Sequence, residues 1–125
     1  MKFESLGAEE KKMIKHVEKN NIFVLETKSF HYVLGIDGEG FNRHIHWGEK
    51  CDVNDYEFEE VHGISSNDPA LNGIKQEITP FGSTMYRECD IKARFEDGCR
   101  EIFLVYKGFE QNGDTLKLHF EDEYY

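Results

Sequence analysis

The sequence predicts an α+β fold in which one N-terminal helix packs on a mostly antiparallel β-meander sheet, or partly open barrel, of about six to eight strands. Apolar residues recur at helical spacing near the N-terminus, and from residue 22 onward they alternate with polar residues as they do in strands. Short turn dipeptides separate the alternating segments. Because no helical segment lies between the strands, parallel crossovers and a doubly wound nucleotide-binding fold are disfavoured.

The helix is predicted over residues 7–19, among lysines and glutamates. Ser5 is placed to cap its first turn, and the Asn-Asn pair at residues 20–21 supplies the left-handed conformation that commonly ends a helix. Its narrow apolar stripe consists of Met13, Ile14 and Val17. The helix should therefore lie on the surface of the sheet, with this apolar stripe toward the sheet.

The rest of the chain should form a β region over residues 22–120 and an acidic tail over residues 121–125, within a single domain that spans residues 1–125. Asp-Gly and Asn-Gly dipeptides, which favour tight hairpin turns, stand at residues 37–38, 97–98 and 112–113. Alternating or short apolar segments predict strands at residues 22–26, 30–36, 41–47, 55–61, 85–95, 100–107 and 116–120.

The net charge of -10 is concentrated in two short blocks. Residues 49–60 hold six acids and one lysine, and residues 110–125 hold five acids and one lysine, so the two blocks sum to -9. A concentrated negative field attracts a basic partner and repels nucleic acid and anionic membranes. We therefore expect a protein partner, and neither nucleic acid nor a membrane.

The sequence also predicts a cytoplasmic protein without a cofactor. The first residues, MKFESLGAEEKK, lack the apolar stretch of a signal peptide. Three cysteines without a C-x-x-C spacing suit a reducing compartment. No nucleophile elbow, dinucleotide loop or Walker lysine is present, so we expect a protein that is not an enzyme.

One pair of residues suggests a metal site as an alternative. His44 and His46 stand two apart on a predicted strand, and two imidazoles on one face are good ligands for a transition metal. With Gly38 before them and Glu49 after them, the pair resembles part of the first cupin motif. Pro80-Phe81-Gly82 resembles the turn of the second cupin motif, but no third histidine follows it. This resemblance implies a small cupin-like metalloprotein or enzyme, whereas the main reading assigns no metal.

Aromatic residues are interleaved with the acids of both blocks. Tyrosine and tryptophan bury much area at an interface, and carboxylates around them can pair with basic side chains. The predicted partner-binding residues are Trp47, Glu49, Asp52, Asp55, Tyr56, Glu57, Phe58, Glu59 and Glu60 in the first block and Glu121, Asp122, Glu123 and Tyr124 in the second.

In size, charge pattern and lack of catalytic motifs, the chain is similar to small acidic bacterial immunity proteins of polymorphic and contact-dependent toxin systems. The resemblance implies that the chain binds a cognate toxin, typically a basic nuclease, and covers its active-site cleft. Glu57, Glu59 and Glu60 would then occupy sites meant for phosphates. An acidic adaptor domain with another protein partner would use the same surface, and the sequence leaves that alternative open.

Overall fold

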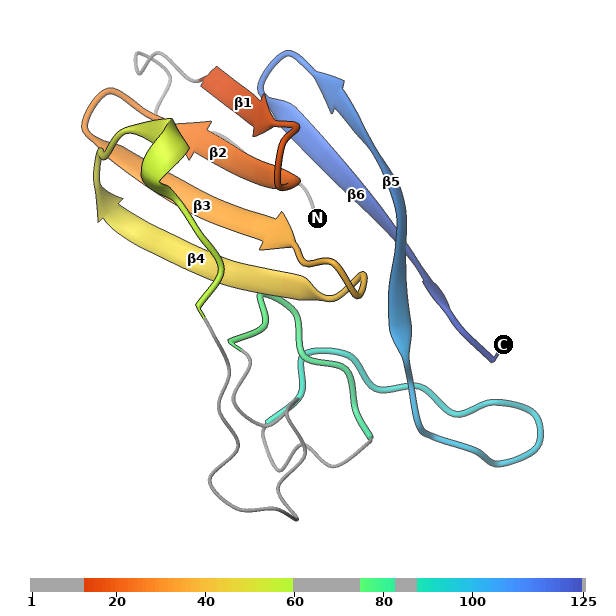
Figure 1. The fold of residues 1–125 in the computed structure, drawn as a ribbon. Coiled ribbons are helices and arrows are strands. Elements are labelled where there is room, and N and C mark those ends of the chain that lie inside the picture. Colours follow the sequence, from red (N-terminus) through yellow and green to blue (C-terminus); the bar gives the residue numbers. More distant parts are fainter. Residues whose placement is uncertain (1–12, 60–74, 83–87, 125) are drawn as a thin grey trace.

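The computed structural model describes residues 13–59, 75–82 and 88–124, and in these ranges the protein is nearly all β (Figure 1). Four strands form an antiparallel sheet in the order β1-β2-β3-β4, and two form a second antiparallel pair. The strands are β1 (Met13–Val17), β2 (Ile22–Glu26), β3 (Phe30–Ile36), β4 (Asn42–Glu49), β5 (Leu104–Asn112) and β6 (Thr115–Asp122). The predicted α+β class is therefore wrong.

The predicted N-terminal helix is the main error. Its C-terminal half is strand β1, in which Ile14 pairs with Leu25 of β2, and residues 7–12 lie outside the described part of the chain. Asn21 does adopt a left-handed conformation, with φ of 54°, but it does so in a hairpin turn. The helical spacing of the apolar residues in this segment is outweighed by its pairing with β2, which is apolar at four of five positions, because tertiary packing overrides weak local propensity.

The hairpins after β1 match the prediction. Strands β2, β3 and β4 pair antiparallel in sequence order. In the turn before β4, a carboxylate oxygen of Asp37 accepts hydrogen bonds from the backbone N–H groups of Glu39 and Phe41, each at 3.0 Å. Gly40 has φ of 89° there, and Gly113 has φ of 59° in the turn between β5 and β6. Local turn chemistry thus sets these connections.

Two other predicted strands, at residues 55–61 and 85–95, are not formed by those of their residues that the structure describes. Residues 55–59 form no ladder; they follow the 3₁₀ helix η1 (Val53–Asp55), although Tyr56 and Phe58 still turn inward and Glu57 and Glu59 outward. In the described part of residues 85–95, Ile91 makes only an isolated bridge to Pro80. The following turn exists, since the N–H of Phe95 donates to the carbonyl of Cys99 at 2.8 Å, but strand β5 begins only at Leu104.

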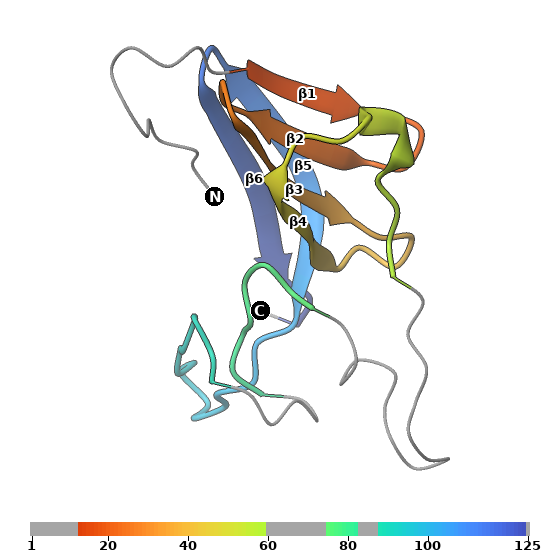
Figure 2. The same ribbon diagram turned by 90° about the vertical axis from the view of Figure 1, so that its left-hand side faces the viewer.

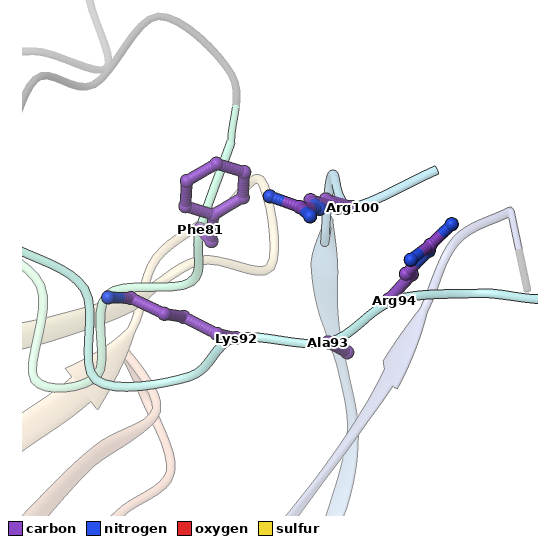
Figure 3. A pocket seen from close by; sticks show the side chains of 5 residues that line it. All are labelled: Phe81, Lys92, Ala93, Arg94 and Arg100. Carbon is purple, nitrogen blue, oxygen red and sulfur yellow. The ribbon is translucent and has the colours of Figure 1, made fainter. Parts of the chain in front are cut away.

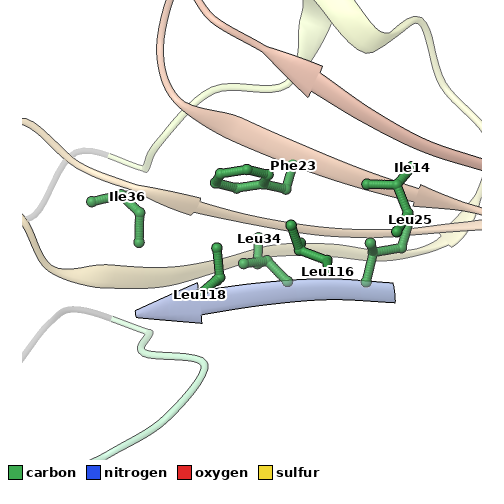
Figure 4. Close-up of a cluster of buried hydrophobic side chains, with 7 residues drawn as sticks. All are labelled: Ile14, Phe23, Leu25, Leu34, Ile36, Leu116 and Leu118. Carbon is green, nitrogen blue, oxygen red and sulfur yellow. The ribbon is translucent and has the colours of Figure 1, made fainter. Parts of the chain in front are cut away.

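The two sheets pack face to face, as Figure 2 shows in side view. Leucines of β6 point between β2 and β3 from the opposite layer (Figure 4). The first hydrophobic cluster consists of Ile14, Phe23, Leu25, Leu34, Ile36, Leu116 and Leu118, with Tyr32, Tyr106 and Phe120 packed against it. Burial of this apolar area is the main force that holds the layers together.

A second cluster covers the other face of the four-stranded sheet. Ile22, Val24 and Val33 point to this side, where the irregular segment from η1 onward supplies Tyr56, Val53 and Phe58. Both faces of β2 are therefore buried, which explains why this strand is apolar at four successive positions. None of the helical structure in the described ranges has the length and apolar character needed to cross a bilayer.

Candidate ligand-binding site

A β-bulge in β4 places His44 and His46 on opposite faces of the sheet. Leu34 pairs with His44 and Val33 pairs with His46, so Ile45 is the extra residue that breaks the alternation. The His44 ring lies 5.5 Å from Tyr32, on the side of the first cluster. The His46 ring lies 5.4 Å from Tyr56, on the other side. The two imidazoles cannot share a metal ion as the alternative prediction requires.

The bulge instead brings His44 and Trp47 to the same face. There they join Tyr32 and Glu77 in a group that we call the Trp47 surface. The Tyr32 ring lies 5.9 Å from that of Trp47. The Tyr32 hydroxyl donates to one carboxylate oxygen of Glu77, and Nδ1 of His44 lies 2.8 Å from the other. Trp47 is 70% exposed, so an open indole borders a half-buried polar network.

Glu77 reaches this site because its segment runs along the outer edge of β4. The backbone N–H of His44 donates to the carbonyl of Lys75 at 2.8 Å, and the N–H of Ile78 donates to the side-chain oxygen of Asn42 at 2.7 Å. No sequence pattern pointed to Glu77, because it lies 45 residues from its partner Tyr32. For Tyr32 the sequence predicts only a place in the strand at residues 30–36.

The network fixes the protonation pattern of the Trp47 surface. Burial of the Tyr32 ring, together with the nearby Glu77 carboxylate, raises the pKa of Tyr32 above its ordinary value. The phenol therefore keeps its proton and donates to Glu77. Because a carboxylate oxygen only accepts, the Nδ1–H of His44 donates to Glu77.

Two aromatic residues of the first acidic block belong to the second hydrophobic cluster. Tyr56 is buried, and its hydroxyl lies 2.7 Å from Nδ1 of His31. Phe58 packs on the second cluster, with the Arg43 guanidinium 5.5 Å from its ring centroid. These two aromatics were predicted to face a partner, but they cover the chain's own sheet. The exposed acids of this block within the described ranges are Glu49, Asp52, Asp55, Glu57 and Glu59, whereas Glu60 lies outside those ranges.

The second acidic block continues the last strand. Glu121 and Asp122 belong to β6, not to a separate tail. The Asp122 carboxylate accepts from the backbone N–H groups of Phe103 and Tyr124, at 2.8 and 2.9 Å, so it has a structural role. Tyr124 is 75% exposed, and Glu123 is exposed beside it. Of the predicted residues in this block, Glu121, Glu123 and Tyr124 are therefore exposed, whereas Asp122 is half-buried.

The carboxylate of Glu26 lies close to three hydrogen-bond donors. It lies 3.2 Å from Nζ of Lys15, 3.1 Å from Nζ of Lys50 and 3.3 Å from Nε2 of His31. Burial opposes ionisation of the carboxyl, but the hydrogen bonds from Lys50, Lys15 and His31 outweigh it and lower the pKa of Glu26 to about 2. Through these contacts the Glu26 carboxylate links β2 to β1, to β3 and to the segment after β4.

Replacing Glu26 with glutamine should lower the free energy of unfolding by about 1–2 kcal/mol at pH 7. Because the pKa is depressed in the folded state, this stabilisation is present above the unfolded-state pKa and is lost as the pH falls from about 5 to about 2. Urea denaturation across this range should show the two proteins converging at low pH. If the difference in free energy of unfolding between E26Q and wild type did not change with pH, the depressed pKa of Glu26 would be contradicted. The control E57Q, at an exposed position, should be as stable as wild type.

The described residues contain no group of three or more histidine, cysteine, aspartate or glutamate side chains arranged to hold a metal ion. The chemistry available at the Trp47 surface is therefore that of an aromatic plane with hydrogen-bonding groups at its edge. Such a combination suits a ligand that has an apolar face and a rim of hydroxyl groups.

Comparisons with known proteins identify the fold. No family model and no curated protein matches the chain. Among solved structures, the galactosidase domain of the alpha-galactosidase-sucrose kinase AgaSK aligns with a TM-score of 0.73 and 20% identity over 90% of this chain and 20% of that one. The GH36 alpha-galactosidase AgaB from Geobacillus stearothermophilus aligns with a TM-score of 0.66 and 25% identity over 78% of this chain and 14% of that one. The chain thus spans a fifth or less of either protein.

Proposed function

We propose that the chain is a non-catalytic carbohydrate-binding β module that takes galactosides at the Trp47 surface. The observation that carries this proposal is the open indole of Trp47 beside the Tyr32–Glu77–His44 network. A pyranose ring presents C–H groups on one face and hydroxyls around its edge. The C–H face would pack on the indole, and Nε2 of His44 and the indole N–H would hydrogen-bond the hydroxyls.

The fold supports the choice of sugar class. The two solved proteins described above are named as galactosidases, and this chain matches only a small part of each. A galactoside is therefore the ligand to test first.

Binding is favoured over hydrolysis because glycosidases need a pair of carboxyl groups on either side of the scissile bond. At the Trp47 surface the described residues provide one carboxylate, that of Glu77, and both of its oxygens are already hydrogen-bonded. Through these two hydrogen bonds, Glu77 holds Tyr32 and His44 in place. A catalytic domain, if one acts with this module, would be a separate part of the assembly.

The test uses the fact that Trp47 is the only tryptophan in the chain. Its fluorescence reports on this surface alone, and it should shift saturably with the α-galactoside melibiose, with a Kd near 1 mM, and less with maltose. Isothermal titration should show that W47A weakens melibiose binding by about tenfold or more. The matched control Y124A removes another strongly exposed aromatic and should bind as wild type does.

An absence of any melibiose response would overturn the proposal. Equal binding by W47A would also overturn it, since the ligand would then lie elsewhere. The variant H44A tests the hydrogen-bonding part: it should weaken binding while leaving the fluorescence of the free protein close to that of wild type.

A second candidate remains the binding of a basic protein, such as a toxin domain, by the first acidic block. The observation that favours it is that Asp55 and Glu57 are exposed and make no ion pair with any residue in the described ranges. Carboxylates of this kind steer a basic partner. A silent melibiose titration, together with capture of a basic protein that D55K/E57K abolishes, would favour this candidate over the galactoside module.

A further inference from the structure

Three of the five described residues that line a shallow depression outside the Trp47 surface are cationic. It has a volume of about 280 Å³ and is formed by Phe81, Lys92, Ala93, Arg94 and Arg100 (Figure 3). Figure 3 shows the Arg100 guanidinium pointing toward the Phe81 ring, with Lys92 and Arg94 on either side of Ala93. None of the described residues that line it is a carboxylate, although the protein as a whole is acidic.

Backbone hydrogen bonds explain why these residues lie around one depression. The N–H of Phe95 donates to the carbonyl of Cys99 at 2.8 Å, which closes a tight turn and places Arg94 and Arg100 at the next positions outward. The N–H of Phe81 donates to the carbonyl of Ile91 at 2.9 Å, and its carbonyl accepts from the N–H of Ile102 at 2.9 Å. Phe81 is thus held between the two arms of the turn.

The cations have no counter-charge among the residues that the structure describes. Lys92, Arg94 and Arg100 are exposed and take part in no ion pair within the described ranges. Two nearby carboxylates form hydrogen bonds with the backbone. Asp90 accepts from the N–H of Thr79 at 2.9 Å, and Asp97 accepts from the N–H of Cys99 at 2.9 Å. Three like charges around one hollow repel each other, so an anion bound there would relieve the repulsion.

We propose that this depression binds a phosphorylated monosaccharide. Two guanidinium groups suit a phosphate dianion, because each can give it two parallel N–H donors, and Lys92 adds a third positive charge. Phe81 is 40% exposed and offers its ring to the apolar face of the sugar. The volume lies near the lower end for small-molecule sites, which limits the ligand to about one sugar ring.

Chemical-shift titration of the ¹⁵N-labelled full chain tests this proposal with three probes: glucose 6-phosphate, inorganic phosphate and glucose. Glucose 6-phosphate should bind saturably, with shifts centred on residues 91–94 and 100–102, and more tightly than inorganic phosphate. Glucose should leave these signals unmoved. The double variant R94Q/R100Q should weaken glucose 6-phosphate binding by at least about tenfold. The control K117Q removes an exposed lysine of β6 and should bind as wild type does.

The variant F81A separates the two parts of the site. It should reduce glucose 6-phosphate binding to the level of inorganic phosphate, because the phosphate contacts remain. The proposal is overturned if no probe saturates, if R94Q/R100Q binds as wild type does, or if inorganic phosphate binds wild type as tightly as the sugar phosphate. Unchanged signals of β2 and β3 in each variant confirm that the fold is intact. Because Trp47 takes no part, these outcomes are independent of the melibiose titration.

Discussion

The variant F23A should lower the free energy of unfolding by about 3–5 kcal/mol. Phe23 is fully buried in the first cluster, between the two sheets. Its ring stacks on His16 with centroids 4.5 Å apart and meets the ring of Phe109 edge-on at 5.0 Å. Truncation removes buried apolar area and leaves a cavity that paired strands on both sides cannot close. Guanidinium denaturation, with the slope compared to wild type, measures the loss.

The neighbouring Phe109 provides a matched control, since it touches the same ring but is 38% exposed. F109A should cost about 1–2 kcal/mol. F23L keeps most of the buried volume and should cost less than F23A. If F23A and F109A lowered stability equally, Phe23 would not be the centre of the packing between the sheets.

The second large effect is expected for G35A, with a loss of about 2 kcal/mol. A Cβ atom at Gly35 would lie 2.9 Å from two ring carbons of Phe58 and 3.1 Å from a side-chain carbon of Ile22. Ile22 is buried within a paired strand, so Phe58 would have to move. Its displacement would also take the ring away from Arg43, whose guanidinium lies over it. Thermal or urea denaturation measures the change.

Gly38 is the natural control because a Cβ atom there meets nothing within 4 Å. G38A should therefore leave stability within about 0.5 kcal/mol of wild type. The pair G35A/F58A should recover part of the loss, since the clash is gone even though the ring is missing. Equal stability of G35A and G38A would mean that the segment after η1 does not press on the sheet.

The sequence predicted the parts of the fold that depend on neighbours in the chain. Strands β2, β3 and β4 follow from alternation and from the Asp37 turn, because each of these signals lies within a few residues. The N-terminal segment was predicted incorrectly because its apolar spacing fits a helix when it is taken alone. Pairing with the apolar strand β2 makes this segment extended, and no pattern within the segment itself predicts that pairing.

The candidate site was predictable only in part. Trp47 was predicted as a partner-binding residue, and its side chain is 70% exposed. Glu77 could not be found, because it reaches Tyr32 across 45 residues through a segment without a ladder of its own. The inward position of Tyr56 and Phe58 also depends on tertiary structure, since alternation shows that two faces differ but not which of them meets the core.

The single extra residue Ile45 gives β4 one histidine for each side of the sheet. His44 lies beside Trp47, and His46 lies against Tyr56 beneath the acidic segment. The imidazole signals in a proton spectrum are therefore two separate probes carried by one strand. A ligand that docks on the indole should move the first signal and leave the second in place, and a basic protein that docks on the acidic segment should do the reverse.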